Sequence, residues 1–206
     1  MASVLAGFRP VKHLNGSPYN GQVNRYMVAA GEGVAINVGD LVKLADDAAI
    51  VDPINGGVYP AVERAGTSTT TAVTAAAIVG AVVGFVPDYS NLNLNNVRLA
   101  STYRIALVSD SPDIIYAAPQ DADGGVVAAA SVGLNAALVP GVTSTTGSVA
   151  SGMSVDSSSV STTSTLPLRV VGVTASPDND VTATDRPAEL LVMINTPANG
   201  FSIQGV

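Results

Sequence analysis

Short apolar runs separated by turn-forming residues recur along the chain, and this spacing restricts the fold classes that the chain can adopt. The runs are rich in Val, Ala, Leu and Ile, and clusters of Gly, Pro, Asn and Asp stand between them. They are residues 23–29, 34–38, 41–44, 49–51, 78–86, 103–108, 113–116, 126–130, 132–139, 168–174 and 189–195. Strands at such spacing are typical of all-β sandwiches and barrels, and no long segment shows the 3.6-residue period of an amphipathic helix. We therefore predict an all-β fold.

Residues 117–137 are the best alternative candidate for a helix, because they are rich in Ala. Pro119, Gly124, Gly125 and Gly133 interrupt the stretch, however, and residues of these two types are the least favourable inside a helix. The pattern favours strands here as well.

Residues 72–86, AVTAAAIVGAVVGFV, are the most apolar stretch and place Gly80 and Gly84 at the spacing of a membrane helix-packing motif. A helix needs roughly 20 apolar residues to cross a bilayer, and this stretch is shorter and lacks flanking Trp, Lys or Arg anchors. Val, Ile and Gly at this density favour a buried strand instead. We expect no membrane partner.

The first thirty residues differ from the rest in charge. Arg9, Lys12 and Arg25 lie there and the first carboxylate is Glu32, so all sixteen acidic residues but only six of the nine Lys and Arg fall in residues 31–206. A basic, Gly- and Pro-broken lead segment predicts an extended N-terminal arm over residues 1–30, followed by a single β-rich domain over residues 31–206. An arm of this kind docks on another protein. Its candidate contact residues are Phe8, Arg9, Lys12, Tyr19, Arg25 and Tyr26, since Tyr and Arg are enriched at binding hot spots.

Composition narrows the partner classes. Charged residues make up only 12% of the chain and hydrophobic ones 47%, so we expect much of the surface to be rich in Ser and Thr or buried against partners. Fifteen of the 23 residues from 143 to 165 are Ser or Thr, which predicts a long surface loop or hydroxyl-bearing edge strands. The formal charge of −7 and the lack of any basic run argue against nucleic acid as a partner.

The residues that usually carry out catalysis are scarce. There is no Cys and a single His, His13, which excludes the usual zinc ligand sets. A Ser–His–Asp triad would have to use His13, and the nearest match to a nucleophile elbow, residues 152–156, has Asp156 where the second Gly belongs. We expect neither an enzyme nor a cofactor.

Calcium is a weaker possibility. Asp121 and Asp123 begin a D-x-D-G sequence of the kind that opens a calcium loop, but no acidic residue follows between Gly124 and Leu134. Turn formation by Asp and Gly is the favoured interpretation of these residues.

Several stretches resemble one family. The opening sequence GFRPVKHLNGSPYNGQVNRY, residues 7–26, is similar to the start of the capsid decoration, or cement, proteins of short-tailed bacteriophages. A hairpin-like stretch and three C-terminal stretches resemble the same proteins, at residues 103–119, 166–172, 176–179 and 190–195. The chain departs from the family pattern at residues 196–199, TPAN, where another Asn and a His are expected.

This resemblance implies a jelly-roll-like sandwich or a barrel that clamps the outer surface of a virion. Its partner would be the major capsid protein, bound across the joints between subunits, and the chain itself would be a homo-oligomer, a dimer or trimer at a symmetry axis. Synthesis would take place in the host cytoplasm, since the N-terminus lacks the pattern of a signal peptide. No nucleic acid or membrane would be bound.

Two other functions remain open at this point. One is a carbohydrate-binding or host-adhesion β module, whose sugar site would use Tyr59, Tyr89, Tyr103 or Tyr116, although strand patterns favour a core position for the last two. The other is a small hydrolase that uses His13.

Overall fold

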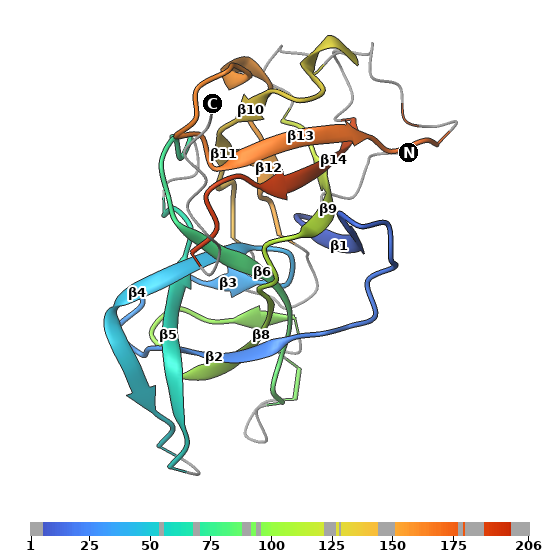
Figure 1. Cartoon of the computed structure of the whole chain (residues 1–206). Helices are drawn as coiled ribbons and strands as arrows, with labels where there is room; N and C mark the ends of the chain where they lie inside the picture. Colours follow the sequence, from blue (N-terminus) through green and yellow to red (C-terminus); the bar gives the residue numbers. More distant parts are fainter. Residues whose placement is uncertain are drawn as a thin grey trace.

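In the computed structural model of the chain, the regular secondary structure that is described consists almost entirely of strands (Figure 1). The structure describes residues 6–53, 56–67, 71–87, 92–93, 96–121, 127, 129–143, 151–176, 179 and 188–198, without the side chains of residues 47 and 48. Within these ranges no helix is long and apolar enough to cross a membrane. The prediction of an all-β fold is confirmed.

The strands form two main sheets. Their bounds are β1 (Arg9–His13), β2 (Asn24–Val28), β3 (Ile36–Asn37), β4 (Leu41–Val51), β5 (Val58–Arg64), β6 (Ile78–Phe85), β7 (Val97–Arg98), β8 (Arg104–Ser109), β9 (Ile114–Pro119), β10 (Asn135–Ala136), β11 (Leu138–Val139), β12 (Ser154–Val155), β13 (Leu168–Val173) and β14 (Glu189–Ile194). Two short 3₁₀ turns are η1 (Ala129–Ser131) and η2 (Ser157–Ser159). Strands β2-β5-β4-β6-β8 close into a barrel, and β1-β9-β14-β13-β10 form an antiparallel sheet. The pairs β3-β7 and β11-β12 are small separate sheets.

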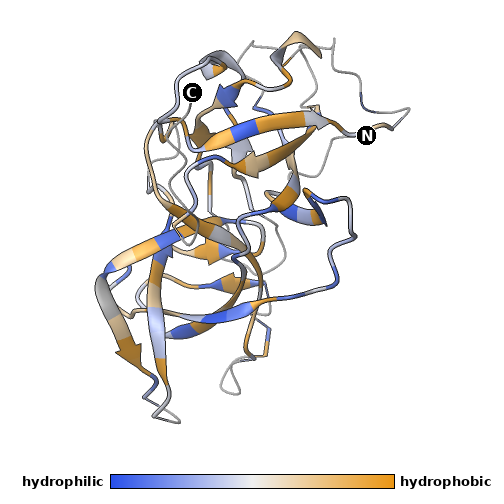
Figure 2. Cartoon of the chain, in the orientation of Figure 1, coloured by the Kyte–Doolittle hydropathy of each residue, from blue (hydrophilic) through white to orange (hydrophobic). Residues whose placement is uncertain are grey.

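Strand β6 lies between the two main hydrophobic cores. Residues 78–82 are all buried, and Ile78 and Ala81 pack into the core of the five-stranded sheet while Val79 and Val82 pack into the core of the barrel. A strand with apolar neighbours on both faces needs an unbroken apolar sequence rather than an alternating one. This explains the apolar sequence of residues 78–82 (Figure 2), and the prediction of a buried strand in the stretch 72–86 is confirmed for these residues, whereas Val83 is 36% exposed.

The glycines of β6 have different roles. A Cβ on Gly80 would lie 2.0 Å from the carbonyl oxygen of Ser109, because the backbones of β6 and β8 approach closely at that point. A Cβ on Gly84 would meet nothing nearer than the Cδ1 of Leu107, at 3.8 Å. Gly80 therefore sets the spacing of the two strands, whereas Gly84 does not.

Replacing Gly80 by Ala should accordingly lower the free energy of unfolding by about 1–3 kcal/mol or more, since the new methyl group must push two backbones apart. The Gly84→Ala variant is the matched control on the same strand, and we expect it to change the free energy by less than about 1 kcal/mol. Urea unfolding monitored by circular dichroism measures both. Equal effects of the two substitutions would contradict the assigned role of Gly80.

The N-terminal segment is part of the folded body. Strand β1 pairs with β9 and β2 pairs with β8, while Phe8 is 1% exposed in the sheet core and Tyr26 is 6% exposed in the barrel core. The prediction of an arm that leaves the body is therefore wrong for residues 6–28. The physical reason is that charge asymmetry reports which surface a segment exposes, while its apolar side chains decide where the backbone goes.

The Ser- and Thr-rich tract differs from a surface loop at residues 151–157, whereas residues 162–165 are exposed and lie outside strands, as predicted for a loop. Ser151, Met153 and Val155 are buried, and β12 within the tract pairs with β11 in a two-stranded sheet. The alternative prediction, edge strands that bear hydroxyl groups, agrees with residues 154–155. Residues 144–150 lie outside the described part of the chain.

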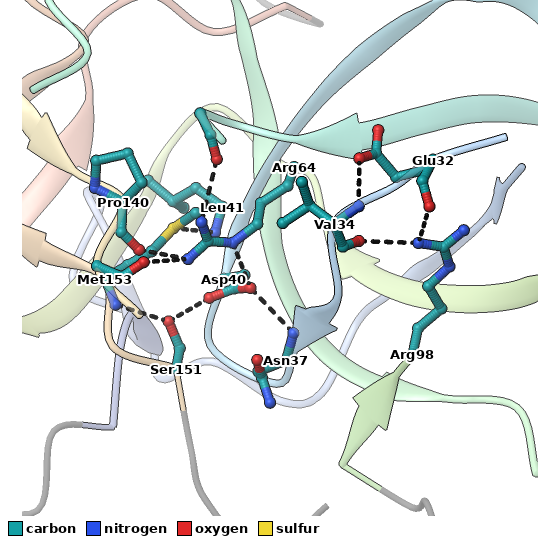
Figure 3. Close-up of polar contacts among 12 residues, drawn as sticks. Glu32, Val34, Asn37, Asp40, Leu41, Arg64, Arg98, Pro140, Ser151 and Met153 are labelled. Carbon is teal, nitrogen blue, oxygen red and sulfur yellow. Dashed lines mark hydrogen bonds and ion pairs between the residues drawn. The ribbon is translucent and has the colours of Figure 1, made fainter. Parts of the chain in front are cut away.

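A buried ion pair joins the barrel to the loops beside the sheet (Figure 3). The Nε of Arg64 on β5 lies 2.9 Å from the Oδ2 of Asp40, and both side chains are at most 1% exposed. The same carboxylate accepts hydrogen bonds from the N–H of Asn37, at 2.9 Å, and from the hydroxyl of Ser151. The guanidinium also donates to the carbonyl of Pro140. Residues from four separate segments are thus held around one carboxylate.

Removing the charge of Asp40 should destabilise the protein strongly, because Arg64 would remain buried without its counter-ion. We expect Asp40→Asn to lower the free energy of unfolding by about 3–5 kcal/mol. Glu63→Gln is the control, since it breaks the half-exposed pair of Lys43 on β4 and Glu63 on β5, 2.5 Å apart, and should cost about 1 kcal/mol or less. Chemical denaturation measures the free energy of unfolding of both variants, and similar losses in the two would contradict the assigned role of the buried ion pair.

Candidate partner-binding surface

The exposed residues of β1, of the loop that follows it and of the start of β2 form one continuous surface, called here the N-terminal surface (residues 9–25). A tight turn follows β1: the N–H of Gly16, at a φ of +89°, donates to the carbonyl of His13 at 2.9 Å. The Oδ1 of Asn15 accepts from both the N–H and the hydroxyl of Ser17, at 2.9 and 2.7 Å. The sequence Asn-Gly-Ser thus supplies the turn chemistry that the backbone needs.

After this turn the chain runs back along the outer edge of β1. The N–H of His13 donates to the carbonyl of Ser17, and the N–H of Tyr19 donates to the carbonyl of Val11 at 3.1 Å. Lys12 and Pro18 form an antiparallel bridge between these contacts. The returning segment covers the strand edge, so a partner meets side chains here instead of open main-chain groups.

The turn between β8 and β9 contacts the loop of the N-terminal surface. The hairpin-like stretch at residues 103–119 does not form a hairpin, because β8 belongs to the barrel and β9 to the five-stranded sheet. Both strands are buried on their own sheets, and the turn between them carries the chain from one sheet to the other. Residues 110–113 of this turn lie against the loop that follows β1.

Asp113 fixes the loop to this turn. Its Oδ1 accepts from the hydroxyl of Ser111 at 2.5 Å and lies 3.2 Å from the Nδ1 of His13, and its carbonyl accepts from the N–H of Leu14 at 2.8 Å. The hydrogen bond from Ser111, together with His13, holds the pKa of the Asp113 carboxyl below its ordinary value of 3.8. These contacts hold the turn after β1 in one position.

Asp110 and Tyr19 fix the second half of the loop. The carboxylate of Asp110 accepts from the amide of Asn24, at 2.9 and 3.0 Å, and from the hydroxyl of Tyr26 at 2.7 Å. The hydroxyl of Tyr19 donates to the carbonyl of Gln22 at 2.9 Å, and its ring lies 6.4 Å from the ring of His13. Partial burial, with a smaller effect of Asp110, raises the pKa of Tyr19. The hydroxyl therefore stays protonated and keeps its role as a donor.

An open depression of about 540 Å³ lies between the loop and the β8–β9 turn. Carboxamides, hydroxyl groups, one imidazole and one carboxylate surround it, and no Lys or Arg does. Its lining residues are His13, Asn15, Ser17, Pro18, Asn20, Gln22, Ser111 and Asp113. Such a lining offers donors and acceptors to neutral polar groups, whether main-chain amides or sugar hydroxyls.

His13, Asp113 and Ser111 meet here although residues 13 and 111 are far apart in the sequence. Their arrangement differs from that of a catalytic triad, because the serine hydroxyl and the histidine nitrogen both face the same carboxylate oxygen. In a triad the histidine stands between the other two groups. Sequence reasoning missed this cluster because nothing local marks residues 111–113 as neighbours of residue 13.

The six candidate contact residues separate into two groups. Phe8 and Tyr26 are buried, so their assignment as partner anchors is wrong for this structure. Arg9 and Arg25 are exposed, and Lys12 and Tyr19 are half-buried. The guanidinium of Arg9 is 56% exposed and pairs with Glu189. Sequence reasoning missed Val11 and Leu14, apolar residues of the same surface that are 43% and 58% exposed.

The calcium candidates do not assemble into a site in the described part of the chain. The Oδ1 of Asp121 accepts from the N–H and the hydroxyl of Ser157, at 2.9 and 2.7 Å, which agrees with a structural role at a turn. Asp123 lies outside the described residues. Among those described, no group of three or more His, Cys, Asp or Glu side chains could hold a metal ion.

Comparison with known proteins gave no match, whether to a family model, to a curated protein or to a solved structure.

The pKa of Asp113 offers a test of the contacts beneath the surface. Because its folded pKa is depressed, ionised Asp113 adds stability above the unfolded pKa, and that stability is lost as the pH falls through the folded value. Ser111→Ala removes the largest cause of the depression, so the pKa should rise toward 3.8 and the loss of stability in acid should become smaller. Carboxyl-carbon NMR titration measures the pKa directly, and an unchanged value would contradict the assigned role of Ser111.

Proposed function

We propose that this protein is a structural component of a virion, which binds the outer surface of the capsid across joints between major capsid protein subunits and stabilises the shell. The observation that carries the proposal is the N-terminal surface. The stretch with the most specific resemblance to decoration proteins, residues 7–26, contains this whole exposed surface. The partner of the surface would be the major capsid protein.

Charge supports a docking role for this surface. Three of the six cations in residues 31–206, Arg64, Arg98 and Arg104, are buried. Arg98 donates to the carbonyls of Glu32 and Val34 (Figure 3), and burial lowers its pKa to about 10. These residues therefore do little to balance the acidic exterior. Cations on a surface of an otherwise acidic molecule orient it toward an acidic or polar partner.

The rigidity of the N-terminal surface also supports a docking role. Because β1 and β2 are paired in their own sheets, docking needs no ordering of residues 6–28, and the entropic cost of binding is lower than for a flexible arm. A shell also presents the same joint many times. Modest contacts at each joint together give a strong shell when the bound proteins are linked to one another.

Substitutions on the exposed face test this proposal better than a deletion, since removing residues 1–22 would also remove β1 and the buried Phe8. We expect Leu14→Asp and Arg25→Glu each to weaken binding to capsids at least about tenfold, which corresponds to about 1.4 kcal/mol. The control is Arg169→Glu, an exposed cation on β13 that should bind like the wild type.

Co-sedimentation of the purified chain with undecorated capsids measures the affinity. Binding of both N-terminal variants at wild-type strength would contradict a role of this surface, and no binding by the wild type would contradict the proposed function itself.

Carbohydrate binding is a second candidate, favoured by the amide- and hydroxyl-lined depression. Among the tyrosines considered for stacking on a sugar, Tyr103 is 52% exposed, against the expectation of a core position, and Tyr59 is half-buried. Tyr116 is buried, and Tyr89 lies outside the described residues. A glycan array with the wild-type protein and a Gln22→Ala variant tests this candidate, and an array without any bound glycan would dismiss it.

A further inference from the structure

The hairpin of β4 and β5 extends beyond the barrel (Figure 1). Near its base β4 is paired on both sides, since residues 41–43 also pair with β6. Beyond Leu44 the register shifts, and residues 49–51 then pair with residues 58–60 of β5. The described strands pair with neither segment on its outer side, as β5 meets β2 only at Ala61. Residues 49–51 and 58–60 are called the hairpin tip below.

A two-stranded ribbon of this kind is only marginally stable in water, and its unpaired outer edges are ready to pair with another strand. The two edges differ. Pro60 has no N–H, so β5 lacks a donor there, and a proline on an edge strand discourages pairing. Residues 49–51 of β4 contain no proline, so the edge of β4 is the one open to a further strand.

The side chains of the tip are apolar and accessible. Val51 is 60% and Val58 is 65% exposed, and Ala49 and Pro60 are exposed as well. A single exposed valine is common on protein surfaces, but several on one ribbon with an open edge mark an interaction site. The tip is also uncharged, because residues 49–51 and 58–60 include no Asp, Glu, Lys or Arg.

The absence of charge indicates which partner fits. Two copies of a chain with a formal charge of −7 repel each other, and the repulsion is weakest where uncharged surfaces meet. If β4 pairs antiparallel with the β4 of a second copy about a two-fold axis at Ile50, Ala49 lies opposite Val51. In that register the aspartates that flank the tip in the sequence each fall opposite an uncharged residue. Like charges, which destabilise a strand pair when directly opposed, are thus kept apart.

We propose that the hairpin tip joins two copies of this chain through antiparallel pairing of their β4 strands, in which Val51 of each copy packs against Ala49 of the other. This association does not depend on what the N-terminal surface binds. It assigns the contact between copies and the contact with another protein to different parts of the molecule.

Sedimentation velocity of the full chain over a concentration series tests the proposal. The wild type should be dimeric at micromolar concentration, while Val51→Lys and Ala49→Lys should each raise the dissociation constant at least about tenfold, since the two introduced ammonium groups would lie on one face beside the two-fold axis and repel each other. Val142→Lys is the control, because Val142 is apolar and 71% exposed but lies outside the hairpin, and it should remain dimeric. Far-UV circular dichroism and thermal unfolding show whether the lysine variants keep their fold.

A monomeric wild type, or lysine variants that dimerise like the wild type, would overturn the proposal. A monomeric wild type whose Val51→Lys variant loses capsid binding would overturn it in favour of a direct contact between the tip and the capsid protein. If Leu14→Asp abolishes capsid binding and leaves the dimer intact, the two surfaces act separately, as proposed. Failure of the dimer is thus distinguished from failure of the proposed function.

Discussion

The ion pair of Asp40 and Arg64 is the contact on which the arrangement of the two sheets depends. A charge without a partner is very unfavourable in a protein interior, so each member of the pair requires the other to stay in place. Asp40 also accepts a hydrogen bond from Ser151, and Arg64 donates to the carbonyl of Pro140, so these two residues cannot move away from the barrel without leaving a buried charge without its hydrogen-bond partners. A set of apolar contacts would tolerate small shifts at this junction, whereas this hydrogen-bonded set fixes one geometry.

Strand β6 completes this arrangement because it serves two cores with one stretch of backbone. Ile78 and Ala81 pack into one core and Val79 and Val82 into the other, and Gly80 lets β8 approach closely enough for the barrel to close. The two hydrophobic cores consequently meet at β6, and β8 and β9, which follow each other in sequence, belong to different sheets. The turn between them lies where the sheets meet, and this is the turn that supports the N-terminal surface.

The local part of this fold could be predicted from the sequence, and the long-range part could not. Turn residues and β-type runs indicate most strands, and an apolar run too short to span a bilayer indicates the buried strand β6. The pairing of the strands could not be predicted, because β1 pairs with a strand about a hundred residues away in the sequence. Charge counting marked residues 1–30 as distinct, which is true of their exposed side chains, yet Phe8 and Tyr26 fill the two cores. The residue pairs of the candidate surface, His13 with Asp113 and Tyr26 with Asp110, likewise depend on contacts that no local pattern shows.

A small number of charges divides the exterior of this molecule into different regions. With only 12% charged residues and three arginines used inside, the remaining cations and the carboxylates decide which faces attract and which repel. The N-terminal surface combines Arg9 and Arg25 with exposed Leu14, and the contacts of Asp110 and Asp113 hold its loop in place. The hairpin tip has no charge and an open strand edge, which suits contact between identical acidic chains. A protein that must meet both its own copy and a repeated partner surface needs two regions that differ in this way, because one region of uniform charge would favour one of the two contacts at the expense of the other.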